Sequence, residues 1–320
     1  MKRVLVTGAG GFIGSHLVSY LHEQGHWVRG VDLKRPEFAD TIADEFLTLD
    51  LRLASSCEQA MDGVEDVYAL AADMGGMGFI SANHGTILRN NALIDLHSFD
   101  AARAAGVQRY LYTSSACIYP EHLQTQTQVA GLREDSAFPA DPQDAYGWEK
   151  ILGELINRYG GQEWGIDTRT VRFHNIFGPL GTYRGGREKS PAALCRKVAA
   201  ASPGDAVEVW GDGEQTRSFC YIDDCVEGIV RLMESGYREP LNLGTDRMVT
   251  INELAQIVIR ISGKPDLHLE HVEGPQGVRG RNSDNERLRE VLGWEPRVTL
   301  EEGLEKTYRW IDKQMAAAEA

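Results

Sequence analysis

The sequence predicts an α/β protein with a Rossmann-type, doubly wound parallel sheet and a smaller C-terminal α/β substrate lobe. Three observations support this fold class. Short apolar strands alternate with helical patterns up to Phe173, a glycine-rich turn follows the first strand, and after Phe173 the chain becomes rich in glycine, proline and charge. Alternating strands and helices are typical of a parallel sheet with helices on both faces.

The first strand and the turn after it predict a dinucleotide-binding site. Lys2–Thr7 reads KRVLVT, and the turn GAGGFIG at residues 8–14 runs directly into an apolar-periodic helix, Phe12–Leu21. Glycine is needed in such a turn because the backbone must approach a pyrophosphate closely, with the helix N-terminus directed at it. The predicted cofactor contacts in this turn are Gly8, Gly11, Phe12, Ile13 and Gly14.

The second strand, Trp27–Val31, ends at an acidic residue, Asp32. A carboxylate at this position accepts hydrogen bonds from the ribose hydroxyls and repels a 2′-phosphate, so it favours NAD over NADP. Lys34 and Arg35 lie nearby and weaken that inference, because a cation could accept a phosphate. NAD is therefore the predicted cofactor.

The alternation continues along the chain. Ligands bind beyond the carboxyl ends of parallel strands, so the residues that end the strands are candidate cofactor contacts. Asp50 and Leu51 follow the third strand, where an adenine would lie, and Ala71 and Phe173 are further candidates. The expected strands are Glu45–Leu49, Asp66–Ala71, Arg109–Thr113 and Asp167–Arg172, and the expected helices are Asn83–Ala105 and Ala145–Tyr159.

Two interleaved domains are expected. A strand and helix at Ser218–Met233 read as a return to the sheet after the glycine- and proline-rich segment. The NAD-binding domain is therefore assigned to residues 1–173 with a returning segment at about 218–246. The substrate lobe is assigned to residues 174–217 and 247–320.

Composition narrows the function classes. The formal net charge of −14 argues against nucleic acid or an anionic membrane as partner. No apolar run is long enough to span a bilayer, and no charged leader with an apolar core precedes the first strand. The five cysteines are scattered and lack metal-type spacing, which favours reduced thiols and no metal site. A cytoplasmic protein is expected.

The strongest chemical signal is a tyrosine and a lysine at i and i+4, Tyr146 and Lys150, on one face of a predicted helix. The ammonium of such a lysine lowers the pKa of the phenol, which then takes or returns the proton of a carbinol during its oxidation. A Ser-rich turn at the end of a strand, SSACIYP at residues 114–120, precedes this helix and contains Cys117. A thiol has no role in carbinol oxidation, so it indicates a further step, and proton abstraction beside a transient ketone is the best candidate.

With these residues assembled, the chain resembles the extended short-chain dehydrogenase/reductase superfamily over essentially its full length. Within that superfamily it is most similar to enzymes that epimerise a GDP-linked sugar. The resemblance depends on long, specific strings: ADMGGMGFI (72–80), SSACIYP (114–120), PQDAYGWEK (142–150), RFHNIFGP (172–179), GGREKSPAALCRK (185–197), WGDGEQTRSF (210–219) and GVRGRNSDN (277–285).

The resemblance implies NAD-dependent epimerisation of GDP-mannose at carbons 3 and 5, giving GDP-L-galactose with GDP-L-gulose as a side product. Tyr146, assisted by Lys150, removes the proton of the carbon-4 hydroxyl while that carbon is oxidised, and Ser115 hydrogen-bonds the same hydroxyl. The resulting ketone acidifies the hydrogens on carbons 3 and 5. The resemblance assigns the acid/base pair that inverts these centres to Cys117 and Lys189.

Scattered cations predict where a nucleotide sugar binds. Lys197, Arg217, Arg279 and Arg281 are candidates for the diphosphate, because arginine can engage phosphate oxygens bidentately. The other candidate substrate contacts are Gly75, Ala116, Asn175, Glu188, Gln215 and Thr216, in addition to Ser115, Cys117 and Lys189.

A homodimer is expected by analogy with the superfamily.

Two alternative functions share parts of this pattern. A GDP-L-fucose synthase shares the thiol-containing loop but uses NADPH and a histidine, and Asp32 and Lys189 both argue against it. A non-catalytic NAD-sensing protein of the same fold is the second alternative, and the set Ser115, Tyr146 and Lys150 argues against that one.

Overall fold

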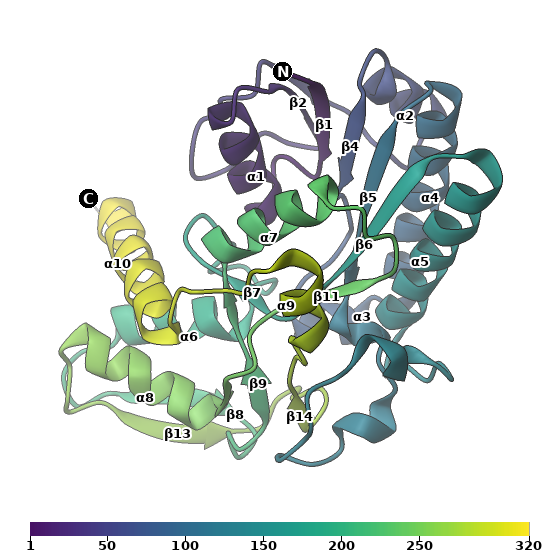
Figure 1. The fold of residues 1–320 in the computed structure, drawn as a ribbon. Helices are drawn as coiled ribbons and strands as arrows, with labels where there is room; N and C mark the ends of the chain where they lie inside the picture. The colour runs from purple at the N-terminus through teal and green to yellow at the C-terminus, as the bar shows by residue number, and fades with distance from the viewer. Residues whose placement is uncertain (320) are drawn as a thin grey trace.

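The computed structural model describes residues 1–319, and it confirms the predicted fold class. Seven parallel strands form one sheet in the order β11-β6-β5-β4-β1-β2-β3 (Figure 1). The strand order reverses beside β1, which is where a doubly wound sheet opens its ligand crevice. The strands are β1 (Arg3–Thr7), β2 (Trp27–Asp32), β3 (Glu45–Thr48), β4 (Asp66–Ala69), β5 (Arg109–Ser115), β6 (Asp167–Phe173) and β11 (Leu241–Leu243).

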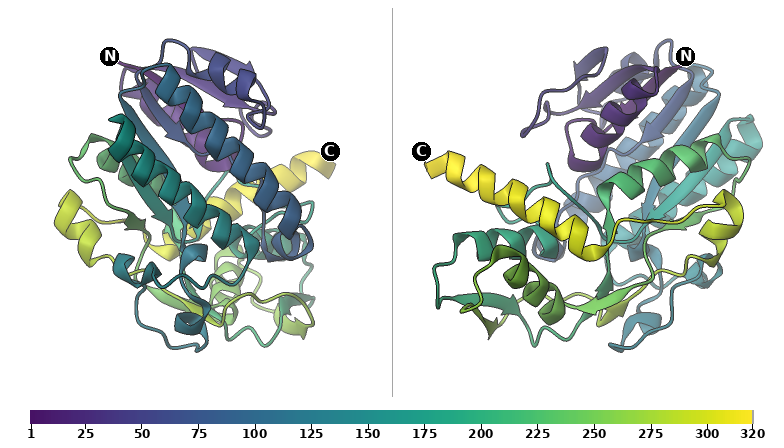
Figure 2. Two further views of the ribbon diagram at one scale, coloured as in Figure 1. Left: turned by 90° about the vertical axis from the view of Figure 1, so that its right-hand side faces the viewer. Right: turned by 60° about the vertical axis from the view of Figure 1, so that its left-hand side comes forward.

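Helices cover both faces of this sheet because its strands are apolar on both sides. Leu5 and Leu111, in the middle of β1 and β5, are fully buried. On one face α4 packs against both α2 and α5, and on the other face α1 packs against α7 (Figures 1 and 2). These helices are α1 (Phe12–Glu23), α2 (Ala54–Met61), α4 (His84–Ala104), α5 (Ala145–Trp164) and α7 (Ile222–Glu234).

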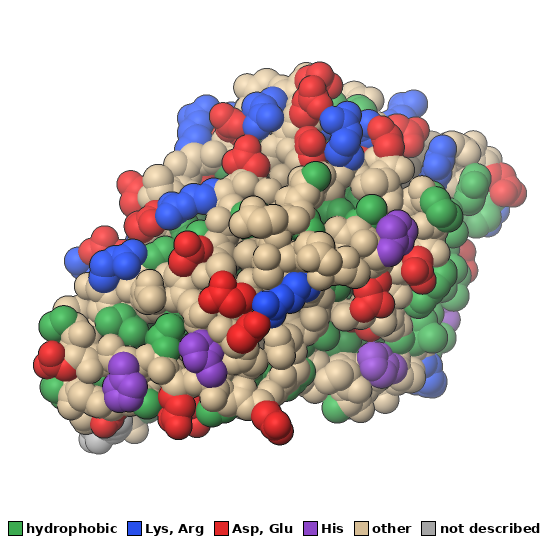
Figure 3. All heavy atoms as spheres, turned by 90° about the horizontal axis from the view of Figure 1, so that it is seen from below, with side chains coloured by type: hydrophobic (Ala, Val, Ile, Leu, Met, Phe, Trp, Pro, Cys, Tyr) green, Lys and Arg blue, Asp and Glu red, His purple; other side chains and the backbone are tan. Residues whose placement is uncertain are grey.

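The smaller lobe lies beyond the carboxyl ends of the strands. In it α6 (Ser190–Ala200) packs against α8 (Ile251–Ser262) and α10 (Leu300–Glu319). Figure 2 shows α10 running away from the body of the molecule. The face in Figure 3 carries acidic and basic side chains scattered among apolar ones. The remaining elements are β7 (Ile176–Phe177), β8 (Ala206–Trp210), β9 (Thr216–Ser218), β10 (Cys220–Tyr221), β12 (Met248–Thr250), β13 (His268–Val272), β14 (Gly280–Arg281) and α9 (Glu286–Leu292).

Several predicted boundaries differ from the observed ones. β4 ends at Ala69 rather than Ala71, and α5 continues to Trp164, where Gly165 ends the helix in a left-handed conformation. A short helix that the sequence did not predict, α3 (Met77–Ala82), precedes α4. In the returning segment the short strand β10 pairs with β7, and β11 is the strand that joins the seven-stranded sheet. None of the helices within residues 1–319 combines the length and apolar character that a membrane crossing requires.

Candidate functional site

A cavity of about 930 Å³ lies between the carboxyl edge of the sheet and the smaller lobe. It collects nearly all the predicted site residues, although they are spread over most of the chain. All the predicted cofactor contacts line it: Gly8, Gly11, Phe12, Ile13, Gly14, Asp32, Asp50, Leu51, Ala71, Tyr146, Lys150 and Phe173. So do most of the predicted substrate contacts: Gly75, Ser115, Ala116, Cys117, Asn175, Glu188, Lys189, Lys197, Gln215, Arg217 and Arg281.

The glycine turn has the close packing that a dinucleotide site needs. A Cβ on Gly14 would lie 2.1 Å from the carbonyl oxygen of Gly8, so only glycine allows α1 to start directly against the turn. The Asp32 carboxylate accepts hydrogen bonds from the backbone N–H groups of Gly10 (3.0 Å) and Lys34 (3.3 Å). Burial raises the pKa of Asp32, and these backbone donors oppose the rise. The cradle and the acidic residue fit the adenosine half of NAD.

The two cations beside Asp32 have partners of their own. The Lys34 ammonium lies 3.3 Å from the Glu37 carboxylate, and the Arg35 guanidinium lies 5.0 Å from the centroid of the Phe46 ring. The Lys34–Glu37 pair is exposed, and the ring contact leaves the N–H groups of Arg35 free, so the preference for a cofactor without a 2′-phosphate depends on Asp32.

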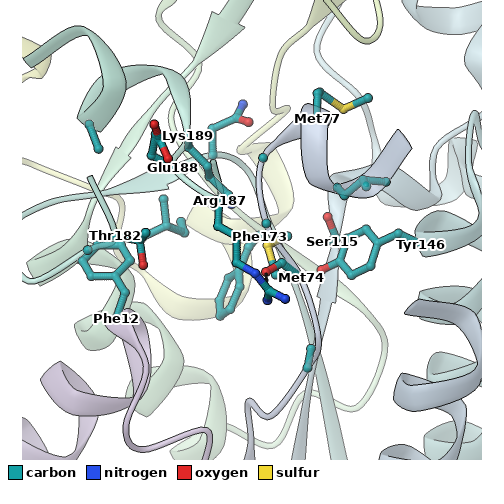
Figure 4. A pocket seen from close by; sticks show the side chains of 18 of the residues that line it. Phe12, Met74, Met77, Ser115, Tyr146, Phe173, Thr182, Arg187, Glu188 and Lys189 are labelled. Carbon is teal, nitrogen blue, oxygen red and sulfur yellow. Dashed lines mark hydrogen bonds between the residues drawn. The ribbon is translucent and has the colours of Figure 1, made fainter. Parts of the chain in front are cut away.

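The start of α5 brings Tyr146 and Cys117 into the same part of the cavity. The Asp144 side chain caps the helix by accepting a hydrogen bond from the Gly147 N–H at 2.9 Å. A Cβ on Gly147 would lie 2.3 Å from the carbonyl oxygen of Cys117, so the helix packs directly on the thiol-bearing turn. Figure 4 shows Ser115 beside Tyr146 on one side of the pocket. Burial raises the pKa of the Tyr146 phenol, while the Lys150 ammonium and a hydrogen bond with Ser115 oppose that rise.

Behind Tyr146, Lys150 is held in a buried polar cluster that sequence reasoning missed. We define the Lys150 cluster as Lys150, Glu149, Tyr112, Asp95 and Asn91. The Lys150 ammonium donates to the Tyr112 hydroxyl at 3.0 Å and lies 3.2 Å from the Glu149 carboxylate. The Tyr112 hydroxyl donates in turn to Asp95 at 2.8 Å, and Asn91 donates to Glu149 at 2.9 Å. Two features of the sequence could have indicated this cluster. Glu149 is adjacent to Lys150, and Asp95 is a lone aspartate on the buried face of a long helix.

Burial and neighbouring charges shift the pKa values of Asp95 and Lys150 in the Lys150 cluster. Burial raises the pKa of Asp95 well above its usual range; the Lys150 ammonium opposes this rise, and the nearby Glu149 adds to it. Burial alone would lower the pKa of Lys150, but the carboxyls of Glu149 and Asp95 outweigh that effect and raise it. Room for the cluster comes from Gly153, where a Cβ would lie 2.0 Å from the Tyr112 hydroxyl oxygen.

Near the Cys117 thiol lie cations that have no carboxylate partner among residues 1–319. Arg281 donates to the Cys117 sulfur at 3.3 Å and to the Gln124 side-chain oxygen at 2.6 Å. Arg217 donates only to backbone carbonyl oxygens, among them that of Val278 at 2.7 Å. Burial and the neighbouring Arg281 lower the pKa of Arg217 to about 9. Within residues 1–319 neither guanidinium forms a salt bridge, so this wall of the cavity favours an anion.

Lys189 precedes α6 and faces the cavity. The Lys189 side chain is exposed to the cavity, and desolvation by the protein around the cavity lowers the pKa of its amine. Among its charged neighbours, Arg281 lowers the pKa of this amine further, while the thiols of Cys117 and Cys225 raise it. An amine with a lowered pKa is suited to proton transfer near neutral pH.

Two predicted substrate contacts do not line the cavity. The Thr216 hydroxyl donates to the carbonyl oxygen of Thr127 at 2.6 Å, so it already has a partner outside the cavity. Arg279 forms a two-bond salt bridge with Asp212, at 2.8 and 2.7 Å, on the outer surface. Of the residues that do line the cavity, Lys197 is already paired with Glu208 at 3.3 Å. Among residues 1–319 there is no cluster of three or more His, Cys, Asp or Glu side chains that could hold a metal ion.

Comparison with known proteins agrees with this geometry. The model of the NAD dependent epimerase/dehydratase family matches residues 4–244. The chain belongs to this family. Membership in an NAD-dependent family confirms the predicted cofactor, and the glycine cradle with Asp32 is where this family member would hold it.

Two curated relatives of this family member are plant enzymes that match nearly the whole chain. The GDP-mannose 3,5-epimerase of Arabidopsis thaliana is 49% identical, and the match covers 99% of this chain and 84% of the relative. The GDP-mannose 3,5-epimerase 1 of Oryza sativa subsp. japonica is 50% identical, with 98% and 82% covered.

Solved structures of the epimerase fold are also similar. The UDP-glucose 4-epimerase of Thermotoga maritima with UDP-glucose has a TM-score of 0.87 at 27% identity, covering 98% of this chain and 99% of that one. The UDP-glucose 4-epimerase of Thermus thermophilus in complex with NAD has a TM-score of 0.83 at 25% identity, covering 97% and 98%.

Proposed function

We propose that this protein epimerises GDP-mannose at carbons 3 and 5 to GDP-L-galactose, with GDP-L-gulose as the 5-epimer. The observation that carries the proposal is an identity of 49–50% to GDP-mannose 3,5-epimerases over nearly the full chain. The cavity agrees with it, because it combines a dinucleotide cradle, a tyrosine–lysine pair and two arginines that have no carboxylate partner among residues 1–319.

The first step is oxidation at carbon 4 of the sugar. NAD, when bound, accepts the hydride from carbon 4 and later returns it, so no net redox change results. Tyr146 takes the proton of the carbon-4 hydroxyl, and Ser115 hydrogen-bonds the same oxygen. The Lys150 ammonium stabilises the phenolate form of Tyr146, since it opposes the effect of burial on the pKa of that phenol.

The second step is inversion beside the ketone. A carbonyl at carbon 4 acidifies the hydrogens on carbons 3 and 5, because an enolate spreads the resulting charge. Cys117 and Lys189 line the cavity and interact electrostatically, which suits an acid/base pair. One removes a proton from one face of the sugar and the other delivers a proton to the opposite face.

The GDP part of the substrate would occupy the side of the cavity formed by the smaller lobe. Arg217 is free of carboxylate partners within the described residues and can engage the diphosphate. The side-chain oxygen of Gln215 is buried and has no hydrogen-bond partner within residues 1–319. An unpaired acceptor that lines the cavity suits the N–H groups on the edge of guanine.

A fucose synthase-like activity is disfavoured by the position of His174. This side chain is fully buried and lies outside the cavity, with one ring nitrogen 3.0 Å from the Asn242 side-chain oxygen. Burial lowers the pKa of His174 to about 3, so it stays neutral and is a poor proton donor.

We further propose a cytoplasmic homodimer. The outer faces of α4 and α5 expose large apolar side chains at positions spaced for one face of each helix: Leu88 and Leu96 on α4, and Trp148, Leu152 and Tyr159 on α5. Large apolar side chains exposed on two neighbouring helices suit an interaction surface. All five cysteines are free, which suits a reducing compartment.

The domain division proposed from the sequence is also retained. Two contacts support grouping the segment at about 218–246 with residues 1–173: α7 packs against α1, and β11 pairs with β6. The smaller lobe then comprises residues 174–217 and 247–320.

The test of the proposed activity is incubation with GDP-mannose in deuterated water without added cofactor, with mass analysis of the recovered sugar. We expect deuterium at carbons 3 and 5 and two epimeric products. Failure of the folded, NAD-loaded protein to exchange any GDP-hexose would contradict the proposal.

A further inference from the structure

The segment that carries Lys189 crosses the cavity between the two domains. We define the strap as residues 182–189, which connect β7 to α6, and the facing loop as residues 72–79. Both segments line the cavity. Figure 4 shows Glu188 and Lys189 on one side of the pocket and Ser115 with Tyr146 on the other. The Arg187 side chain extends from the strap into the space between them, toward Met74.

Arg187 makes three kinds of contact with the facing loop. Its guanidinium donates to the Asp73 carboxylate at 3.1 Å and to the carbonyl oxygen of Met74 at 3.3 Å. The same group stacks on the Phe79 ring, 3.7 Å from its centroid. An isolated, half-exposed ion pair is a weak contact. The combination with ring stacking and a backbone acceptor makes Arg187 a specific clasp that a lysine would reproduce only in part.

The backbones of the two segments also meet. The Gly76 N–H donates to the carbonyl oxygen of Arg187 at 3.1 Å, and a Cβ on Gly76 would lie 2.5 Å from the carbonyl oxygen of Glu188. On the strap itself, Gly185 and Gly186 have φ values of +91° and +84° with no neighbouring atom close to where a Cβ would be. The strap therefore enters the cavity through two glycines that nothing packs against, so its position depends on the contacts beyond them.

The partner of Arg187 is itself fixed to the sheet. Asn90 donates to the Asp73 carboxylate at 3.0 Å, and the Asn91 side-chain oxygen accepts from the Asp73 N–H at 2.6 Å. Both asparagines belong to α4, which packs against the sheet domain. Asp73 is thus anchored to the sheet domain, and the contacts of Arg187 join the strap to that anchor.

We propose that Arg187 is a positioning residue: by clasping Asp73 and Phe79 it holds the strap across the cavity and fixes Lys189 opposite Cys117. This inference rests on the proposed function, in which Lys189 is one member of the acid/base pair. It assigns Arg187 to inversion at carbons 3 and 5 and to no part of the oxidation at carbon 4, because Ser115, Tyr146 and Lys150 are held by the other domain.

The test compares Arg187→Ala with Arg187→Lys, and uses Arg184→Ala as the control. Arg184 lies on the same strap and is exposed, and it does not line the cavity. Two rates are measured with GDP-mannose: solvent deuterium exchange at carbons 3 and 5, and reduction of bound NAD on adding substrate. Small displacements of a catalytic group cost up to ~10²-fold. We expect Arg187→Ala to lose ~10- to 10²-fold in exchange while NAD reduction stays near the wild-type rate. The exchange rate of Arg187→Lys should lie between the rates of the wild type and of Arg187→Ala.

A second readout follows Lys189 without requiring turnover. Competitive labelling with acetic anhydride over a range of pH, followed by mass analysis, reports the pKa of the Lys189 amine. Desolvation lowers the pKa of this amine in the wild type, so release of the strap should raise it toward its ordinary value of about 10.5. In the Arg184→Ala variant the pKa of Lys189 should not change.

The outcomes distinguish a failure of the proposed function from a failure of the positioning role of Arg187. If the wild type exchanges no deuterium, the proposed function fails whatever Arg187 does. If the wild type exchanges and Arg187→Ala matches it in both rate and Lys189 labelling, the positioning role is overturned. Equal losses of exchange and of NAD reduction would also overturn it, because they would show a general effect on the cavity.

Discussion

Replacing each of the two carboxyl groups of the Lys150 cluster, Glu149 and Asp95, should lower the stability of the protein by a different amount. In Glu149→Gln the Lys150 ammonium loses its only salt-bridge partner among residues 1–319, and both side chains are at most 3% exposed. Removing one member of a buried ion pair costs about 3–5 kcal/mol of stability. In Asp95→Asn a neutral amide replaces a carboxyl whose pKa burial raises well above its usual range, and the amide oxygen can still accept from the Tyr112 hydroxyl. That change should cost only about 1 kcal/mol at acidic pH.

The two variants should also differ in how their stability depends on pH. The pKa of Asp95 is raised in the folded protein, so its proton contributes stability that is complete below the unfolded pKa of about 3.9 and is lost as pH rises through the folded pKa. Within that window the wild type loses about 1.4 kcal/mol per pH unit from this group, whereas the amide of the Asp95→Asn variant does not titrate. Asp95→Asn should therefore gain stability relative to the wild type as pH increases.

Urea denaturation of both variants and the wild type, at about pH 5 and at about pH 8, measures these differences as free energies of unfolding. Equal losses in Glu149→Gln and Asp95→Asn at both pH values would refute the raised pKa of Asp95. A relative loss of stability by Asp95→Asn at the higher pH would refute it as well.

The remaining predictions concern the reaction. Tyr146→Phe should abolish both NAD reduction and deuterium exchange, because no ketone forms without the phenol; exchange at the wild-type rate would exclude the ketone route. Cys117→Ala should still reduce NAD on adding GDP-mannose but lose ~10²-fold or more in inversion, as expected for a missing acid/base group, and Cys117→Ser should behave alike. Normal inversion by Cys117→Ala would assign the thiol to packing. Gly14→Ala should remove NAD from the purified protein, because its Cβ would lie 2.1 Å from the Gly8 oxygen. Gly85→Ala, where a Cβ meets nothing within 4 Å, is its control, and retained NAD in Gly14→Ala would contradict the cradle.

Reasoning from the sequence was weakest for the arginines of the smaller lobe and for the short helix α3 of the NAD-binding domain. Arg279 and Arg281 stand two residues apart and were equivalent as diphosphate candidates, yet one pairs with Asp212 on the surface and the other reaches the Cys117 sulfur. α3 was not expected, because six residues following a glycine-rich loop give too short a pattern to distinguish from a turn. The spacing of residues cannot show which side chains already have a partner.

By itself, the sequence determined the fold class, the dinucleotide turn and the tyrosine–lysine pair. These features depend on local periodicity, on glycine at sterically crowded positions and on a helical spacing of four residues. Each of them can be recognised from residues that are close together in the sequence. The tertiary structure alone decided the Lys150 cluster, the contact between Arg281 and Cys117, and the clasp of Arg187 on Asp73. Each of these joins residues far apart in the sequence, and the burial that sets their charge exists only once the chain has folded.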